Sequence, residues 1–430
     1  MISRVVSKYA LVACFLLLNS GVLFAQDKND SPEVLNRQTD AIDVIKGMFS
    51  KKTGTPDDTV KKTHSAFSIL PSAGYNPSVG FSIGVTSTTG KTFGDPKTTT
   101  FSVFNANAYT STGGLSSFEF KNNVFTNNDK FNIQGSFQIG NTVAADYGIG
   151  TGQHAFGEGT FSFNGFPLEN NADVFPIQFT YFKFNERVYY KVLKNLYAGA
   201  GLVINYYHNI DDERRVGPNI ATHHFRYSVI NGYPTDNYSA NGLLFNVAYN
   251  TRDHVNRPYY GMYADVVLRL NQQWMGSQHY ASQLKVELRK YWSLSRKNPE
   301  HVLAYWLWSS YLLGGSLPYL ELTGTGSDAL GRMGRGYTIG RFKGANFFYS
   351  ELEYRFPITK NKLISGVTFV NGQTARNIRR DVNLFQYIEP AAGVGLRLLF
   401  NKNSRSNLCI DYARGAYGSS GIFLGLNEVF

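Results

Sequence analysis

Apolar and polar residues alternate with a period of two through most of this sequence. Between residues 262 and 270 every second side chain is apolar, and the opposite face carries Asp265 and Arg269. The same alternation recurs in other segments, among them 196–206, 283–289 and 392–400. A period of two is the pattern of a β-strand whose two faces meet different surroundings. Segments of about ten residues are also long enough to cross a lipid bilayer when they are tilted.

The lengths of the connections between these segments distinguish a membrane barrel from a soluble β-sandwich. Long connections, roughly residues 144–173, 209–239, 317–345 and 372–388, follow odd-numbered segments, whereas the connections after even-numbered segments are short. Outer-membrane barrels have short turns on the periplasmic side and longer loops outside. A sheet in a bilayer must also close on itself, because its backbone groups find no water there. We therefore predict an all-β fold, a 16-stranded antiparallel transmembrane β-barrel over residues 65–430, in the bacterial outer membrane.

The start of the chain has the features of a secretory signal peptide. Arg4 and Lys8 precede an apolar stretch that ends at Ala25, and a polar segment follows. Removing residues 1–25 lowers the net charge from +11 to 11 − 2 = +9. It also leaves Cys409 as the single cysteine, so no intramolecular disulfide is predicted. The 32 phenylalanines, 28 tyrosines and 42 glycines fit a barrel with aromatic girdles at the two membrane interfaces.

Residues 26–64 are predicted to form a periplasmic segment with one helix, over residues 31–52. Ser31 is a suitable N-cap, and Pro32 occupies the first helical position, where its missing N–H costs nothing. An apolar stripe along this helix needs a surface to pack on, and it consists of Leu35, Ile42, Ile45 and Phe49. The stripe could lie in the barrel mouth, on the membrane-facing rim or against another protein, or the segment could be a loosely attached leader.

A glycine-rich basic stretch occupies the third long connection. The sequence GRMGRGYTIGRFKG, residues 331–344, holds five glycines and four basic residues without an acid. It leads into YSELEYRFPI, in which Glu351 and Glu353 share one face of an expected strand. The RGY motif at residues 335–337 and this strand together resemble the signature of the BamA/TamA superfamily of outer-membrane assembly proteins, the bacterial surface antigen barrels.

Other segments of the C-terminal half carry the same resemblance, which runs from about residue 240 to 430. SGVTFVNG, CIDYARG and GIFLGLNEVF are similar to inner-strand and closing-hairpin motifs of the family, and we predict that Phe430 belongs to the barrel's C-terminal signal. NTRDHVNRPYYGMYADV resembles the family's periplasmic turn, whose matching residues here are Arg252, Asp253, Pro258 and Gly261.

The resemblance implies that the third long connection is an extracellular loop folded back into the lumen. In the family, an arginine of this loop pairs with carboxylates on the two following strands. The usual aspartate on the second of these strands is Asn371 here, so other acids would share the arginine. A solvated basic surface loop is the alternative. The predicted motif is Arg335, Gly336 and Tyr337, and its predicted lumen partners are Glu353, Glu351, Asn371 and Asp411.

The same resemblance implies a role in inserting, assembling or translocating outer-membrane polypeptides. Family members carry periplasmic POTRA modules of about 40 residues or more, and residues 26–64 are too few for one, so we predict a member without them. The predicted partners are outer-membrane lipid, lipopolysaccharide, periplasmic or lipoprotein subunits, and unfolded outer-membrane proteins as clients. The alternative is a passive channel, or a structural partner barrel in an outer-membrane complex.

The sequence gives little support to other kinds of chemistry. We predict no enzyme and no cofactor, because no close histidine-containing constellation that could activate a serine falls on an expected strand. The adjacent His223 and His224 are by themselves a weak signal for a metal, so no metal site is predicted. Basic residues are scattered over strands and loops rather than clustered, and nucleic acid is therefore not a predicted partner.

Overall fold

The structure is a computed structural model, and it describes residues 38–44, 66–76, 80–152, 161–163, 166–168, 174–212, 222–328, 331–378, 381–402 and 405–430. The predicted signal peptide and most of the helix predicted over residues 31–52 lie outside these ranges. Within that predicted helix, the described residues 41–44 form a helical turn. The turn lies beside the connection between two late strands, since Lys402 contacts both Asp40 (N to Oδ2, 2.9 Å) and Asp43 (Nζ to Oδ2, 2.7 Å).

One sheet dominates the described part of the chain. It has 17 strands, and because β10 (Tyr238–Ser239) has only 2 residues, 17 − 1 = 16 long strands remain. The first eight are β1 (Ala66–Asn76), β2 (Gly80–Lys91), β3 (Ser102–Ser111), β4 (Ser116–Phe125), β5 (Phe131–Asp146), β8 (Phe175–Leu193), β9 (Leu196–Asp211) and β11 (Gly242–Asn250). The other eight are β12 (Gly261–Asn271), β13 (Ala281–Ser293), β14 (Val302–Gly315), β17 (Asn346–Pro357), β18 (Ile364–Ala375), β19 (Glu389–Asn401), β20 (Ser406–Gly415) and β21 (Ser420–Leu426).

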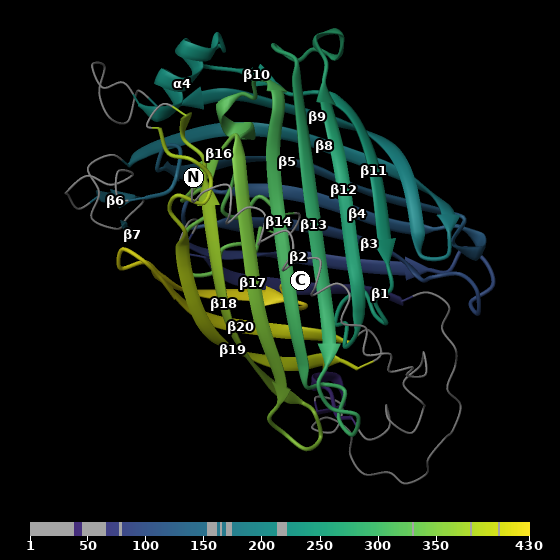
Figure 1. The fold of residues 1–430 in the computed structure, drawn as a ribbon. Coiled ribbons are helices and arrows are strands. Elements are labelled where there is room, and N and C mark those ends of the chain that lie inside the picture. The colour runs from purple at the N-terminus through teal and green to yellow at the C-terminus, as the bar shows by residue number, and fades with distance from the viewer. Residues whose placement is uncertain are drawn as a thin grey trace, which may run out of the picture. The chain divides into compact units, whose positions relative to one another are not determined.

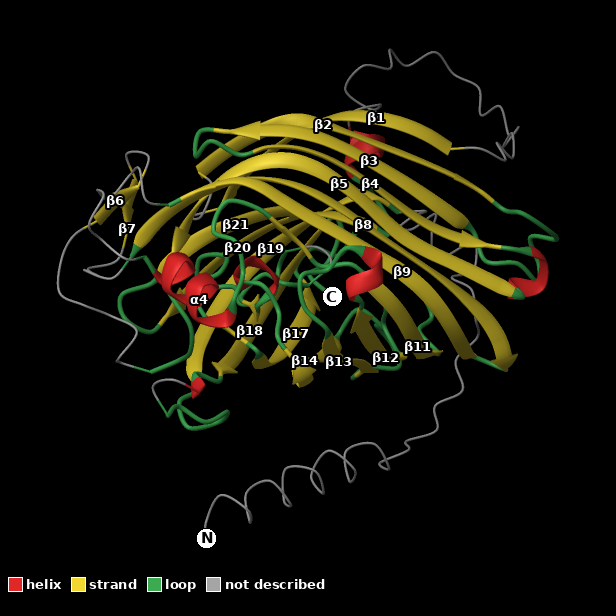
Figure 2. Ribbon diagram, turned by 90° about the horizontal axis from the view of Figure 1, so that it is seen from above, coloured by secondary structure: helices red, strands yellow, loops and turns green. Residues whose placement is uncertain are grey.

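Each long strand pairs antiparallel with the next long strand in sequence, as in the ladders β1–β2, β8–β9 and β20–β21. The first and last strands, β1 and β21, lie side by side, so the sheet curls round on itself. Figures 1 and 2 show the strands curving round, with loop segments between the two sides of the sheet. The predicted antiparallel β-barrel fold is confirmed.

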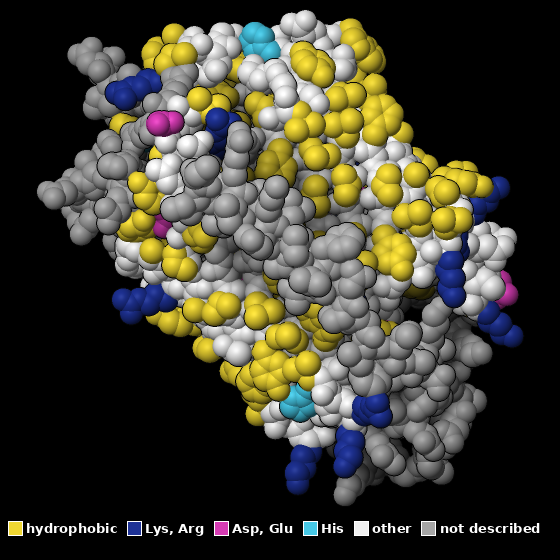
Figure 3. All heavy atoms as spheres, viewed as in Figure 1, with side chains coloured by type: hydrophobic (Ala, Val, Ile, Leu, Met, Phe, Trp, Pro, Cys, Tyr) yellow, Lys and Arg dark blue, Asp and Glu magenta, His cyan; other side chains and the backbone are white. Residues whose placement is uncertain are grey.

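The two faces of the strands have the composition of a membrane barrel. In β20, Asn407, Cys409 and Asp411 are buried, whereas Leu408 and Ile410 are exposed. Apolar side chains therefore cover much of the outer surface (Figure 3), and polar side chains line the interior. This is the reverse of a soluble protein and the pattern of a barrel whose outer face meets lipid. None of the helices in the described residues is long and apolar enough to cross a membrane.

The long connections contain short elements of their own. The β5–β8 connection carries the hairpin β6 (Phe161–Phe163) and β7 (Phe166–Leu168), and the β14–β17 connection carries η4 (Tyr319–Glu321) and the pair β15 (Thr323–Gly324) and β16 (Lys343–Gly344). The β9–β11 connection carries α4 (His223–Asn231) besides β10. Two short 3-10 turns, η1 (Asn127–Asp129) and η3 (Gln273–Met275), lie in the β4–β5 and β12–β13 connections.

Helix α4 was not expected from the sequence, because it is too short to show a repeated apolar stripe. Its end signals are nevertheless present. The Thr222 side chain accepts a hydrogen bond from the Phe225 N–H (3.2 Å), and Gly232 takes the left-handed conformation that ends the helix. Buried His224 lies 3.1 Å from Asp212 (Nδ1 to Oδ2). Burial favours a raised pKa for Asp212, but hydrogen bonds from His224 and Thr222 hold that pKa below its ordinary value.

A charge on the outer face of a central strand should destabilise the barrel in lipid. Leu396, in the middle of β19, is 54 % exposed on the outer face. We expect Leu396→Arg to lower the free energy of unfolding by roughly 2–4 kcal/mol, the usual cost of an arginine near the bilayer midplane. Urea titration of the protein in lipid vesicles measures this change. Leu396→Met is the matched control, and equal stability of the two variants would contradict a lipid-facing position.

Candidate functional site in the barrel lumen

The connection between β14 and β17, residues 316–345 and here called the lumen loop, lies inside the barrel. Thr325, Tyr337 and Phe342 of this loop are buried, and Figure 2 shows loop segments within the ring of strands. Lys343 fastens one end of the loop to β5, since its Nζ lies 2.8 Å from Asp146 Oδ1. The loop therefore occupies the lumen instead of extending from the surface.

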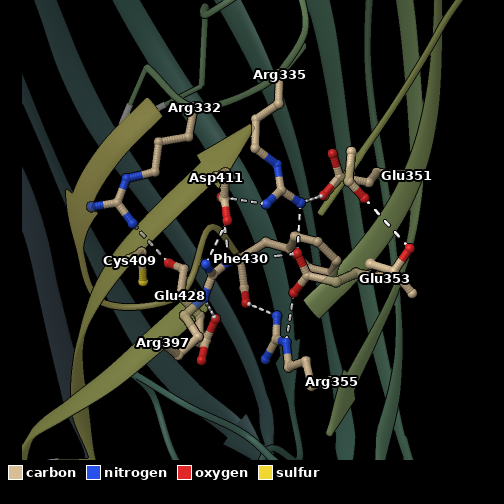
Figure 4. A network of polar contacts seen from close by, with 12 residues as sticks. Arg332, Arg335, Glu351, Glu353, Arg355, Arg397, Cys409, Asp411, Glu428 and Phe430 are labelled. Carbon is tan, nitrogen blue, oxygen red and sulfur yellow. Dashed lines mark hydrogen bonds and ion pairs between the residues drawn. The ribbon is translucent and has the colours of Figure 1, made fainter. Parts of the chain in front are cut away.

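Arg335 is the centre of the loop's contacts with the barrel wall (Figure 4). Its Nη2 donates to Glu353 Oε2 (2.6 Å) and to Glu351, and its Nη1 donates to Asp411 Oδ2 (2.6 Å). The guanidinium also lies over the Phe369 ring, 3.4 Å from its centroid. Burial alone would lower the pKa of Arg335, but the three carboxylates, Glu351 foremost, hold that pKa well above its ordinary value.

Two further arginines balance the acids around Arg335. Arg355 donates to Glu353 (Nε to Oε1, 2.7 Å), and Arg397 donates to both carboxylate oxygens of Asp411. Three arginines and three acids give 3 − 3 = 0 net charge in this cluster. All of these side chains are buried, and buried charges are stable only when they are paired and hydrogen-bonded.

Strand register brings these residues together. The β17–β18 ladder pairs Glu351 with Asn371, so both face the lumen. In the β19–β20 ladder, Gly395 is opposite Asp411 and Arg397 is opposite Cys409, which makes Arg397 and Asp411 diagonal neighbours. The period-two pattern predicts which face each residue occupies, whereas the contact between particular residues follows from register.

Asn371 stands where a carboxylate would add a fourth acid. Its Nδ2 donates to the Arg335 carbonyl oxygen (3.0 Å) and to Glu351 Oε2 (3.4 Å). An aspartate has no such donor when it is ionised. The asparagine therefore holds the loop backbone, and Asp411 of β20 takes the second nitrogen of the arginine.

The residues beside Arg335 fix the backbone of the loop. Gly336 has φ +105°, and a Cβ on it would lie 2.7 Å from the Ala391 Cβ, so neither the conformation nor the space suits another residue. The Tyr337 hydroxyl donates to the Pro390 carbonyl (2.6 Å) and accepts from the Ala416 N–H (2.8 Å). These contacts tie the loop to β19 and to the end of β20.

Of the residues of the predicted periplasmic turn, Arg252, Asp253 and Pro258 lie between β11 and β12, and Gly261 is the first residue of β12. Asp253 Oδ1 accepts from the backbone of Tyr259 (2.8 Å), and its Oδ2 binds Arg405 (2.7 Å). Gly261 has φ +103°. Arg252 lies over the Tyr263 ring, 4.6 Å from its centroid, and Pro258 is buried. The Asp253–Arg405 ion pair thus joins the turn to the β19–β20 connection.

Phe430 lies inside the lumen. Its ring stacks on Trp306 at 5.2 Å between centroids, and its carbonyl oxygen accepts from Arg355 (3.0 Å). A role in a C-terminal signal stays a prediction. The sequence analysis did not predict that Arg332 and Arg397 contact the residues just before Phe430. Glu428, an acid in a mostly apolar final segment, is the feature that could have indicated these contacts.

The family model described as the Omp85 superfamily domain matches residues 72–417. The chain belongs to the Omp85 superfamily. BamA from Haemophilus ducreyi lacking POTRA domains 1-3 has a similar structure, with TM-score 0.54 and 15% identity over 84% of this chain and 69% of that one. CdiB from Escherichia coli is similar with TM-score 0.53 and 7% identity over 84% of this chain and 62% of that one. Comparison with curated proteins finds no match.

These likenesses agree with the predicted resemblance to BamA-type barrels, and at such low identity they concern the fold alone. The chain spans less than two thirds of the length of the CdiB chain that it matches. Within the described residues, no group of three or more histidine, cysteine or acidic side chains could hold a metal ion. The lumen loop with its arginine cluster is the candidate functional site, because Arg335 binds three buried carboxylates there.

Replacing Arg335 should destabilise the folded barrel. Arg335→Ala leaves three buried carboxylates with less counter-charge, and removing one partner of a buried ion pair costs about 3–5 kcal/mol. We expect the temperature at which the folded form is lost in detergent to fall clearly, as measured by gel mobility. Arg296→Ala, at an exposed turn, is the control, and an unchanged midpoint for Arg335→Ala would contradict a stabilising role.

Changing Asn371 to aspartate should also destabilise the barrel. The substitution removes the donor to the Arg335 carbonyl and adds a fourth negative charge beside Glu351. We expect a loss of at least about 1–3 kcal/mol, the cost of leaving a buried polar group without its partner. Denaturant titration measures it. Asn371→Leu loses the donor without adding charge, and it should be the more stable of the two variants; the opposite order would exclude the charge effect.

Proposed function

We propose that this Omp85 barrel assists the insertion, assembly or translocation of polypeptides at the bacterial outer membrane. Membership of the Omp85 superfamily supports the proposal. The observation that carries it is the lumen loop, which is held in the middle of the barrel by buried Arg335 and its three acids. Because the loop occupies the lumen, a client polypeptide would contact the wall of the barrel and would not pass through an open pore.

The proposed partners follow from the two ends and the outer face of the barrel. Outer-membrane lipid contacts the apolar outer face, and lipopolysaccharide is the proposed neighbour of the long connections. Unfolded outer-membrane proteins are the proposed clients. Periplasmic or lipoprotein subunits are the proposed partners at the short turns, where the helical turn at residues 41–44 lies beside Lys402.

An assembly role predicts faster folding of a client barrel. The purified protein is reconstituted in lipid vesicles, and a urea-unfolded small outer-membrane barrel is diluted into them. We expect the client to become resistant to protease several-fold faster than in vesicles without protein. Depletion in cells should likewise lower the amounts of other outer-membrane barrels.

The control experiment separates this function from a passive channel. Planar bilayers with the same protein should show no large, stable conductance, because the loop fills the lumen. Stable conductance steps, together with no effect on client folding, would overturn the proposal in favour of the passive channel.

A further inference from the structure

The four residues after β21 leave the barrel wall and enter the lumen. Asn427 has φ +69°, a left-handed conformation that asparagine adopts more readily than most residues. The three residues that follow are buried: Glu428 is 3 % exposed, and Val429 and Phe430 are each 4 % exposed. We call residues 427–430 the tail. An acid is expensive to bury unless its charge is neutralised, so the surroundings of Glu428 decide what holds the tail in place.

Glu428 is held by two arginines from different parts of the chain. Arg397 of β19 donates from Nε to Oε2 (2.8 Å), and Arg257 of the β11–β12 turn lies 3.4 Å from Oε1. Asn407 of β20 also donates to Oε1 (2.8 Å). Both carboxylate oxygens are therefore bound. Arg257 also donates to the Ser365 hydroxyl (2.9 Å). This hydrogen bond fixes the position of the Arg257 side chain.

Phe430 fills an aromatic slot formed by residues of β13, β14 and β17. Its ring stacks on Trp306 with an interplanar angle of 24° and lies 6.1 Å from the Tyr291 ring. Arg355 packs over the same ring at 5.3 Å and donates to the Phe430 carbonyl oxygen (3.0 Å). The slot thus recognises an aromatic side chain and the backbone beside it.

The lumen loop contributes the last contact. Arg332 donates from Nη1 to the carbonyl oxygens of Asn427 (2.9 Å) and Glu428 (2.8 Å). The Arg332 N–H is itself bound by Asp328 (2.8 Å). Figure 4 shows Arg332 and Arg397 converging on the tail beside the Arg335 cluster. Arg335 of the loop thus binds acids of the barrel wall, and Arg332 of the loop binds the backbone of the tail.

We propose that these groups form a peptide-binding site in the lumen, which shares Arg355 and Arg397 with the Arg335 cluster and whose ligand is a short acidic and aromatic segment. Its resident ligand is the tail of this same chain. Arg257, Arg397 and Asn407 bind the acid, Trp306 and Arg355 bind the ring, and Arg332 joins the bound segment to the lumen loop. The loop therefore cannot leave the lumen without breaking its bonds to the tail. This coupling would exist whether the barrel assembles polypeptides or conducts solutes.

Cys409 provides a built-in reporter of tail occupancy. Its thiol is buried and donates to the Asn427 carbonyl oxygen at 3.0 Å, so the tail covers it. Labelling of the folded protein in detergent by a maleimide, in a Cys14→Ser background, measures how often the tail leaves. We expect slow labelling in the parent protein and labelling at least about tenfold faster in Arg332→Ala, which loses two charge-assisted hydrogen bonds.

Two further variants test the site independently of the loop. Glu428→Gln removes the charge that Arg257 and Arg397 bind, and Phe430→Ala empties the aromatic slot; both should also speed labelling. If Arg332→Ala fails to fold, the labelling rates of Glu428→Gln and Phe430→Ala decide whether the proposed site holds the tail. Arg341→Ala is the matched control, because Arg341 belongs to the lumen loop and packs on Tyr147 (4.4 Å to the ring centroid), away from the tail.

The expected pattern is fast labelling of the three site variants and slow labelling of Arg341→Ala, with all of them folded by gel mobility. Parent-like rates in Glu428→Gln and Phe430→Ala would overturn the proposal. Equally fast labelling of Arg341→Ala would also overturn it, because general loosening of the loop would then account for the result.

Discussion

Arg335 holds three carboxylates that would otherwise be buried in the lumen with too little counter-charge. The interior of this barrel combines many buried charges with a cluster of buried apolar and aromatic side chains that includes Trp306, Tyr337 and Phe342. The buried charges are held in pairs, and Arg335 and Arg397 each bind acids from two elements. The loop and the wall are consequently one structural unit, because neither has its charges neutralised without the other.

This arrangement also explains why the wall tolerates unusual residues. Asn371 is neutral because Asp411 already supplies the third acid, and its amide serves the loop backbone. Gly336 is needed because the loop passes close to Ala391 in a conformation that side chains disfavour. The position of Arg335 in the lumen therefore accounts for both the asparagine and the glycine.

Much of the fold could be predicted from the sequence, because alternation and connection lengths are local properties. The lumen-facing positions of Glu351, Glu353 and Asp411 followed from the same period. Asp411 was among the predicted partners of Arg335, but the register of the strands and the contact between Arg332 and Glu428, which are 96 residues apart, could not be predicted. The resemblance supplied the partner Glu353, but it gave no hint that residues 427–430 turn inward. Helix α4 was missed because nine residues are too few for a clear apolar period.

Arg397 binds Asp411 with one side of its guanidinium and Glu428 with another, and this sharing has a consequence for the order of folding. Glu428 follows every strand in the sequence, so Arg257 and Arg397 lack this acid until β21 has paired with β20. Barrels that lack only β21 and the tail would therefore leave Arg257 without this carboxylate and Arg397 with Asp411 as its nearest acid. Such intermediates are disfavoured, which makes completion of the cylinder cooperative, and contacts so distant in sequence make it slow.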